Sequence, residues 1–176
     1  MKRLLPFLSV CIVLSGCWRR SVEVNPCGTF QFKMNFNYPG DPGFIYDHLT
    51  GDISGWWDHS FSEDPYRLYI EPRPGGGFYE IFDESGDGAR HATVIYAKRG
   101  EMLRMEGPLG LSGQALTLVC TYRLKPSGDN GTLLTLNVNG AGEFSEETPG
   151  MVKQVWEHFL WERFQPYIQE AYSNRE

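Results

Sequence analysis

Polar and apolar residues alternate over residues 29–38, and this alternation marks the first folded element. Successive side chains of a β-strand point to opposite faces, so a period of two indicates a strand with one buried face. The apolar positions are Phe30, Phe32, Met34 and Phe36, and the polar positions are Gln31, Lys33, Asn35 and Asn37. The pattern therefore predicts a half-buried strand at the start of the folded region.

The hydrophobic spacing then changes to one that is typical of helices. Asp41 and Pro42 indicate a helix start, because an aspartate accepts hydrogen bonds from free backbone N–H groups and proline suits the first helical position. Apolar residues follow at helical spacing as far as Gly51, where this helix is expected to end. A second short helical turn is expected over residues 52–57.

Six more strands are predicted between residues 66 and 139. Segments rich in proline and glycine, or the tight Arg99-Gly100 pair, join them, and such residues favour turns. The expected strands are residues 66–71, 78–83, 91–98, 102–106, 116–124 and 132–139.

The last predicted element is a long amphipathic helix that begins near Thr148. Thr148 can cap it, Pro149 suits its first position, and apolar residues recur along one stripe as far as Ala171. We expect Pro166 to bend the helix, because proline removes a backbone hydrogen bond and crowds the preceding turn. The sequence thus predicts an α+β fold, in which this helix covers the apolar face of a curved antiparallel sheet of about seven strands.

The N-terminus has the pattern of an export signal. Two basic residues precede an apolar run over residues 4–14, which is too short to cross a bilayer as a helix. Residues 14–17, Leu-Ser-Gly-Cys, then resemble the lipobox of bacterial lipoproteins. This resemblance implies cleavage before Cys17, diacylglycerol on its sulfur and an acyl chain such as palmitate on its new amino group. An ordinary signal peptide and an uncleaved apolar N-terminus are the alternatives.

The lipoprotein interpretation divides the chain into a signal peptide (residues 1–16), a lipid-anchored tether (residues 17–28) and a domain (residues 29–176). It predicts an exported protein anchored to a bacterial membrane. The residue after Cys17 is Trp18 rather than aspartate. In a Gram-negative host, similarity to known lipoproteins then favours the outer membrane, with the domain facing the periplasm.

The charge balance limits the partners of the protein. The chain contains 16 basic and 22 acidic residues, which gives a formal net charge of −6. Loss of residues 1–16 removes two basic residues, and the mature form then has a net charge of −8. Nucleic-acid binding needs basic surface to offset phosphate charge, so we expect no nucleic-acid partner.

Cysteine use changes with maturation. Cys11 is lost with the signal and Cys17 carries lipid, which leaves Cys27 and Cys120 as free thiols. An oxidising compartment permits a disulfide between them. However, Cys120 lies in an apolar strand pattern, which favours a buried thiol. No cysteine or histidine spacing resembles a zinc site, and we expect neither a metal nor a cofactor.

The predicted element order resembles the helix-grip fold of the START-like (SRPBCC) superfamily. Residues 44–57, 71–80 and 91–96 resemble the branch related to activators of the heat-shock chaperone ATPase, and the similarity extends over about residues 30–172. The fold implies a cavity between the sheet and the C-terminal helix, although side chains that fill a core are the alternative. Strand parity and the helical stripe give these cavity candidates: Trp57 at the rim, Tyr79, Tyr96, Met105, Tyr122, Trp156, Phe159 and Leu160.

Three functions are compatible with these features. The first is a binding module for a small hydrophobic or amphipathic ligand, which needs only the cavity and the membrane anchor. The second is an enzyme of the cyclase or hydrolase kind, although no nucleophile elbow, metal cluster or spaced carboxylate pair stands out. Its acid–base candidates would be Asp58, His59, Glu71, Glu80, Asp83 and His91.

The third function is protein interaction, either as a chaperone activator or through an exposed rim of Trp56, Trp57 and Phe61. An exported domain does not meet the cytosolic chaperone, so the export signal argues against a role as a chaperone activator. The sequence favours ligand binding.

Overall fold

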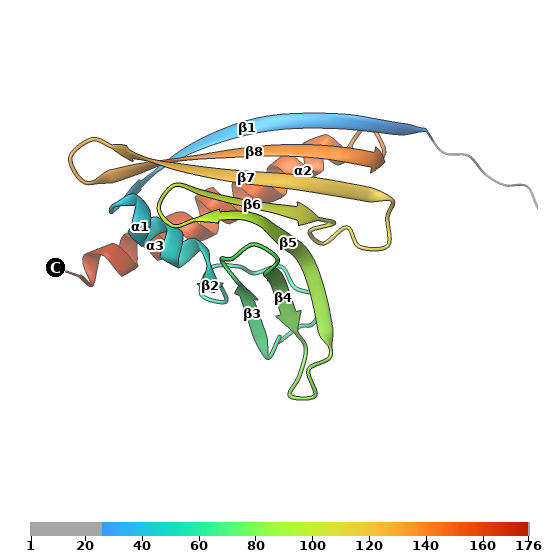
Figure 1. The fold of residues 1–176 in the computed structure, drawn as a ribbon, viewed down its shortest axis with the longest axis horizontal. Coiled ribbons are helices and arrows are strands. Elements are labelled where there is room, and N and C mark those ends of the chain that lie inside the picture. Colours follow the sequence, from blue (N-terminus) through green and yellow to red (C-terminus); the bar gives the residue numbers. More distant parts are fainter. Residues whose placement is uncertain (1–25, 176) are drawn as a thin grey trace, which may run out of the picture.

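An eight-stranded antiparallel sheet packs against a C-terminal helix in the computed structural model, which describes residues 26–175 (Figure 1). The strand order is β1-β8-β7-β6-β5-β4-β3-β2, so the first strand joins the last and all other neighbours are consecutive in the chain. The strands are β1 (Cys27–Pro39), β2 (Gly51–Asp52), β3 (Arg67–Ile70), β4 (Gly77–Ile81), β5 (Gly88–Lys98), β6 (Met102–Gly107), β7 (Leu116–Ser127) and β8 (Gly131–Glu143).

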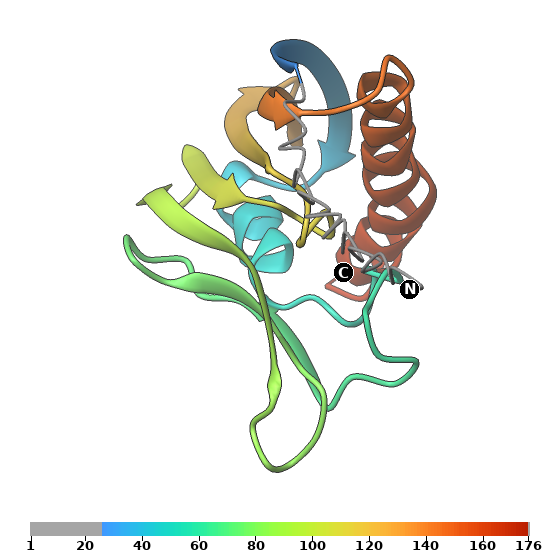
Figure 2. The same cartoon turned by 90° about the vertical axis from the view of Figure 1, so that its right-hand side faces the viewer.

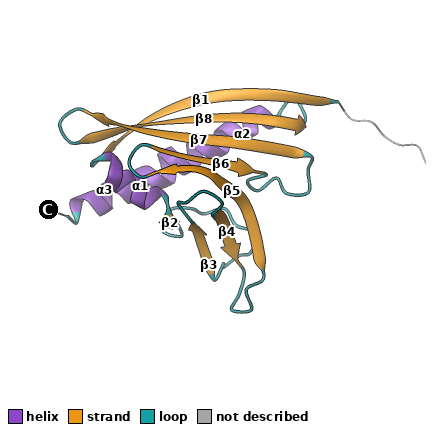
Figure 3. Cartoon of the chain, in the orientation of Figure 1, coloured by secondary structure: helices purple, strands orange, loops and turns teal. Residues whose placement is uncertain are grey.

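All seven predicted strands are present, and their bounds differ from the predicted ones by a few residues. The longest ladder joins β1 to β8, from Cys27 opposite Glu143 to Pro39 opposite Gly131 (Figure 3). Strands β2, β3 and β4 form the other, shorter end of the sheet. β1 starts two residues before the predicted strand, so the domain includes the last residues of the predicted tether.

The predicted short helical turn over residues 52–57 is present but starts later, because strand β2 includes Asp52. Gly51 has a φ of +71°, a conformation that glycine adopts at little cost, and the chain here leaves the first helix to pair with β3. The N–H groups of Trp56 and Trp57 then both donate to the Ile53 carbonyl, at 3.1 and 2.9 Å. One turn of helical hydrogen bonds therefore forms, but it does not extend.

Helix α1 (Pro42–Leu49) follows the sequence prediction. The Asp41 carboxylate accepts hydrogen bonds from the N–H groups of Gly43 and Phe44, at 2.9 and 3.0 Å. At the other end, the Thr50 hydroxyl donates to the Tyr46 carbonyl at 2.9 Å.

The C-terminal helix consists of three segments that run along one face of the sheet (Figure 2). They are α2 (Thr148–Glu157), the π-helical η1 (His158–Arg163) and α3 (Phe164–Ser173). Thr148 is the first helical residue rather than the N-cap, and no side chain caps this end. Pro166 has no N–H for the Glu162 carbonyl and its ring needs space there, which explains why the irregular π-helical segment precedes it.

Tyr38 connects the first strand to the π-helical segment. Its hydroxyl donates to the Leu160 carbonyl at 2.7 Å inside the protein, and its ring packs edge-on against Phe164. Burial raises the pKa of Tyr38, so the hydroxyl keeps its proton and remains a donor.

The core lies between the inner face of the sheet and the C-terminal helix. On β6, β7 and β8 the predicted parity is correct, because the inward-facing side chains are all buried: Leu103, Met105, Leu118, Cys120, Tyr122, Leu134 and Leu136. The helix contributes Trp156, Phe159 and Leu160, which are buried as well.

The predicted parity is wrong for Tyr96. Val94 pairs with Met105 and Tyr96 pairs with Arg104, so the strand has one extra residue, Ile95, at a β-bulge. A bulge turns the following side chains to the opposite face. Tyr96 is therefore 39% exposed on the outer face.

The prediction is also wrong for Tyr79. On β4, the side chains of Phe78 and Glu80 are fully buried, and Tyr79 faces outward, where its ring packs against Tyr69 at 5.4 Å. Phe78 and Tyr79 are both aromatic, so the hydrophobic pattern could not decide which of them faces the core.

Cys27 and Cys120 are both free thiols. Cys27 is exposed at the start of β1, whereas Cys120 is buried on β7, and burial raises the pKa of its thiol. The predicted signal peptide and the lipid-attachment residue Cys17 lie outside the described residues. Within residues 26–175, no helix is both long enough and apolar enough to cross a membrane.

Candidate functional site

The space between the sheet and the helix is filled by the side chains that were predicted to line a cavity there. Trp156 packs against Tyr122 and Phe159, with both pairs of ring centroids 5.8 Å apart. Met105, Tyr122 and Leu160 are at most 2% exposed, as expected for core residues. Of the eight predicted candidates, these three therefore belong to the packed core, and Trp156 and Phe159 are buried in it as well.

An apolar groove of about 270 Å³ opens at one end of this core. Leu109 and Leu111 of the β6–β7 loop form one wall, and Met151, Val155 and Phe159 of the C-terminal helix form another. A deeper pocket of about 70 Å³ shares these residues and extends to Trp156. The groove contains three of the predicted residues, Trp57, Trp156 and Phe159, when both hollows are taken together.

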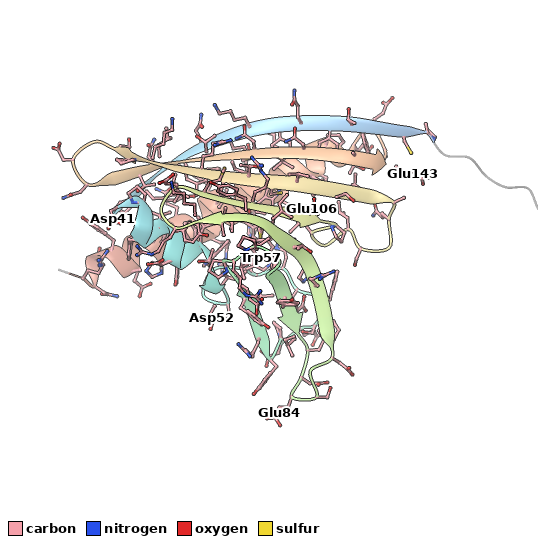
Figure 4. The ribbon with its side chains drawn as sticks, viewed as in Figure 1. Asp41, Asp52, Trp57, Glu84, Glu106 and Glu143 are labelled. Carbon is pink, nitrogen blue, oxygen red and sulfur yellow. The ribbon has the colours of Figure 1, made fainter. Side chains whose placement is uncertain are left out.

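Trp57 forms the third wall of the groove, from the segment between β2 and β3, and lies near the middle of the molecule in Figure 4. Its ring stacks on Phe159 with centroids 3.8 Å apart and meets Phe78 edge-on at 4.8 Å. Its Nε1 atom donates to the His59 carbonyl at 2.6 Å. These contacts fix the position of the wall relative to the helix.

The predicted aromatic rim does not form a continuous exposed patch. Trp56 is 2% exposed, and its Nε1 atom donates to the His48 carbonyl at 3.1 Å inside the domain. Trp57 is half-buried, and only Phe61 is largely exposed.

Glu80 and His91, two of the acid–base candidates, form a buried pair next to the groove. The Glu80 carboxylate accepts hydrogen bonds from the N–H groups of Phe61 and Ser62 and lies 2.8 Å from His91 Nε2. Burial alone raises the pKa of Glu80, but these hydrogen bonds outweigh it and hold the pKa below its usual value. The pair therefore fixes the 61–62 segment to the sheet. His91 also lines the groove.

Asp58 and His59 lie next to a residue that no pattern in the sequence singled out. His158, at the start of the π-helical segment, places Nε2 at 2.9 Å from the Asp58 carboxylate, and His59 Nδ1 lies 3.0 Å from the same group. Arg163 Nε lies 3.1 Å from Asp58, and Glu162 lies 2.8 Å from His158 Nδ1.

These contacts shift two pKa values. Hydrogen bonds to Glu162 and to Asp58 raise the pKa of His158 above its usual value. Burial raises the pKa of Asp58, but hydrogen bonds to His59 and His158 outweigh this effect and lower it. His158 is 100 residues away from Asp58 in the chain, and only the helix packing brings them together.

The remaining acid–base candidates lie on exposed turns. Glu71 pairs with Arg73 at 2.9 Å, and Asp83 accepts a hydrogen bond from the N–H of Ser85 at 2.8 Å. Neither lines the groove, and both stabilise the turns on which they lie.

A larger depression, of about 620 Å³, lies on the outer face of the sheet. It is lined mainly by polar side chains, including Lys33, Arg104 and Arg123, and Arg104 Nε donates to Thr121 at 2.9 Å. This surface is open and polar, so it does not offer a site for an apolar ligand.

No protein-family model matches the chain, and no curated protein matches it. Solved structures do resemble it. A protein of Rhodobacter sphaeroides matches 84% of this chain and 99% of its own, with 16% identity and a TM-score of 0.59. The SA2116 protein of Staphylococcus aureus, of unknown function, matches 84% of this chain and 98% of its own, with 12% identity and a TM-score of 0.57. The chain has a helix-grip fold.

The Mll3558 protein of Rhizobium loti gives a similar result. It matches 74% of this chain and 92% of its own, with 21% identity and a TM-score of 0.55. At these identities the similarity shows the fold alone, and the function has to be argued from the site.

Proposed function

We propose that the protein is a cell-envelope lipoprotein whose domain binds a small hydrophobic or amphipathic molecule in the groove between α2 and the β6–β7 loop. The observation that carries this proposal is the composition of the groove. Its walls are apolar, and a few polar groups, from His59, Ser60 and His91, lie among them. This combination is typical of small-molecule sites, in which apolar walls supply affinity and a few polar groups supply orientation.

The walls of the groove also leave apolar surface in contact with solvent. Met151 is 46% exposed and Phe61 is 50% exposed, although both are large and apolar. A ligand that covered them would remove this surface from water, and this burial would stabilise the complex by about 25 cal/mol per Å² of apolar surface. The volume of the groove, about 270 Å³, is close to the lower limit for sites that bind drug-sized molecules, roughly 300 Å³. We therefore expect a small ligand, or one apolar part of a larger one.

The backbone at the groove supports the same proposal. Leu109 has a φ of +48°, a left-handed conformation that costs a non-glycine residue about 1–2 kcal/mol. Its N–H donates to the His91 carbonyl at 3.0 Å, which holds the loop in this conformation. Residues held in unfavourable backbone conformations occur often at binding sites.

The subcellular location of the protein is part of the proposal, and it rests on the sequence. The lipobox-like residues 14–17 support an anchor on a bacterial membrane. Replacement of Cys17 by serine should move the protein from the membrane to the soluble fraction, and an unchanged distribution would contradict the anchor. Membership of the START-like superfamily is proposed as well; the helix-grip architecture supports it, whereas the chaperone-activator branch rests on the sequence segments.

Native mass spectrometry of the protein purified from its own membrane tests ligand binding. We expect a low-polarity molecule to accompany the unmodified chain. Val155→Trp fills the groove and should abolish this adduct. Gln154→Trp, which adds the same bulk at the neighbouring exposed position of α2, should retain it. Consistently empty protein, or equal loading of the two variants, would contradict the proposal.

A further inference from the structure

Three metal-ligating side chains meet at one end of the groove. Asp58 and His59 follow Trp57 in the chain, and His158 is the first residue of η1. Their potential ligand atoms all lie within 4.8 Å of one another. We propose that Asp58, His59 and His158 bind a divalent transition-metal ion of the Zn²⁺ type. This inference concerns the metal alone and does not depend on the proposed groove ligand.

The chemistry of the three donors fits such an ion. Imidazole nitrogens and carboxylate oxygens bind Zn²⁺ at about 2.0–2.2 Å, so two donors of a tetrahedral site lie about 3.3 Å apart. The Asp58 carboxylate lies 2.9 Å from His158 Nε2 and 3.0 Å from His59 Nδ1. These two spacings are already close to those of a zinc site. The third spacing, between the ligand atoms of the two histidines, is at most 4.8 Å, so metal binding needs these two side chains to move closer together.

Two charged side chains of η1, Glu162 and Arg163, contact two of the three donors. Glu162 lies 2.8 Å from His158 Nδ1, and this contact favours a proton on Nδ1 and leaves Nε2 to bind a metal. A carboxylate behind a histidine ligand is a recurrent feature of metal sites. Arg163 Nε lies 3.1 Å from Asp58 Oδ2 and orients that carboxylate. Its positive charge opposes a bound cation, so we expect micromolar rather than nanomolar affinity.

The packing of Trp57 holds the segment with Asp58 and His59 next to His158 on η1. Its Nε1 atom fixes the backbone of His59 through the 2.6 Å hydrogen bond to the His59 carbonyl. Its ring stacks at 3.8 Å on Phe159, the residue after His158. The protein therefore brings both histidines together before a metal arrives, which lowers the cost of binding.

Three protein ligands leave one position of a tetrahedral ion for water or another small ligand. His59 lines the groove, so this metal site lies at its edge. The acid–base candidates Asp58 and His59 thus gain a common role, which neither had as an isolated residue.

Calorimetric titration of the full chain with Zn²⁺ tests the proposal, and Co²⁺ serves as the spectroscopic substitute. Every sample carries Cys11→Ser, Cys17→Ser and Cys27→Ser, because these thiols of the full chain would bind the same ions, whereas Cys120 is buried. We expect one histidine-dependent ion per chain and visible Co²⁺ absorption of the tetrahedral type. His158→Ala and His59→Ala should abolish both signals. His48→Ala, which removes a histidine that contacts Tyr167 on another part of the domain, should retain them.

Glu162→Gln tests the site without a change of ligand. The Glu162 side chain is 66% exposed, so its replacement should leave the fold intact, and we expect affinity to fall about tenfold. The proposal is overturned if the chain binds no ion more tightly than about 1 mM. It is also overturned if His158→Ala, shown to be folded by circular dichroism, binds Zn²⁺ as tightly as the unmodified chain.

Discussion

The Glu80 carboxylate lies 2.8 Å from His91 Nε2, and both side chains are buried. The same carboxylate accepts hydrogen bonds from the N–H groups of Phe61 and Ser62. The chain between β2 and β3 has little secondary structure of its own, and this contact fixes it to the sheet. Because that segment carries Trp57, Asp58 and His59, the Glu80–His91 pair positions one wall of the groove and two of the three proposed metal ligands.

Replacement of Glu80 by glutamine should destabilise the domain. The amide cannot accept all of the backbone hydrogen bonds, and His91 loses its charged partner, so we expect a loss of about 3 kcal/mol in the free energy of unfolding. Urea denaturation measures this value. Glu84→Gln, at the exposed tip of the β4–β5 hairpin (Figure 4), should change stability by less than about 0.5 kcal/mol. Equal stability of the two variants would show that the pair is dispensable.

Glu80 should also make the free energy of unfolding depend on pH under acidic conditions. The pKa of Glu80 is lower in the folded protein than its usual value of 4.5, so the unfolded chain binds a proton first as pH falls. Its stabilising contribution is present above pH 4.5 and is lost as pH falls through the folded pKa. The stability difference between the unmodified chain and Glu80→Gln should therefore shrink below pH 4.5. Other carboxylates titrate in both proteins and cancel, and a constant difference would refute this assignment.

Tyr38→Phe should weaken the attachment of the C-terminal helix. The variant keeps the ring contacts but leaves the Leu160 carbonyl without the 2.7 Å hydrogen bond, and we expect a loss of about 1.5 kcal/mol. Thermal and urea denaturation measure it. Tyr66→Phe is the matched control, since Tyr66 is 57% exposed. Indistinguishable variants would mean that the hydrogen bond contributes nothing.

Asp41→Ala should destabilise the start of α1 by about 1 kcal/mol, because the N–H groups of Gly43 and Phe44 lose their acceptor. Asp41→Asn should retain most of the stability, since asparagine caps helices about as well. Asp64→Ala, at an exposed loop position, serves as the control in the same denaturation series. A loss in Asp41→Asn as large as in the alanine variant would point to charge rather than capping.

Local patterns in the sequence identify most of the secondary structure. The alternation in β1, the Asp41 cap and the apolar stripe of the C-terminal helix each depend on neighbouring residues, and the structure confirms them. The sequence could not place the β-bulge at Ile95 or the facing of Tyr79, because both depend on pairing with another strand. For these two reasons Tyr79 and Tyr96 were predicted to line the cavity, whereas the structure places both on the outer face of the sheet.

The candidate site shows more clearly which features follow from local sequence patterns and which depend on contacts between distant parts of the chain. The sequence by itself determined the α+β architecture, the acidic charge and the aromatic residues that form the core, because these follow from composition and period. Tertiary structure alone decided that the predicted cavity is a packed core with a groove at its end. It also decided that His158 lies beside Asp58, 100 residues away. Contacts at that separation arise from how the helix packs on the sheet, and no local pattern in the chain records them.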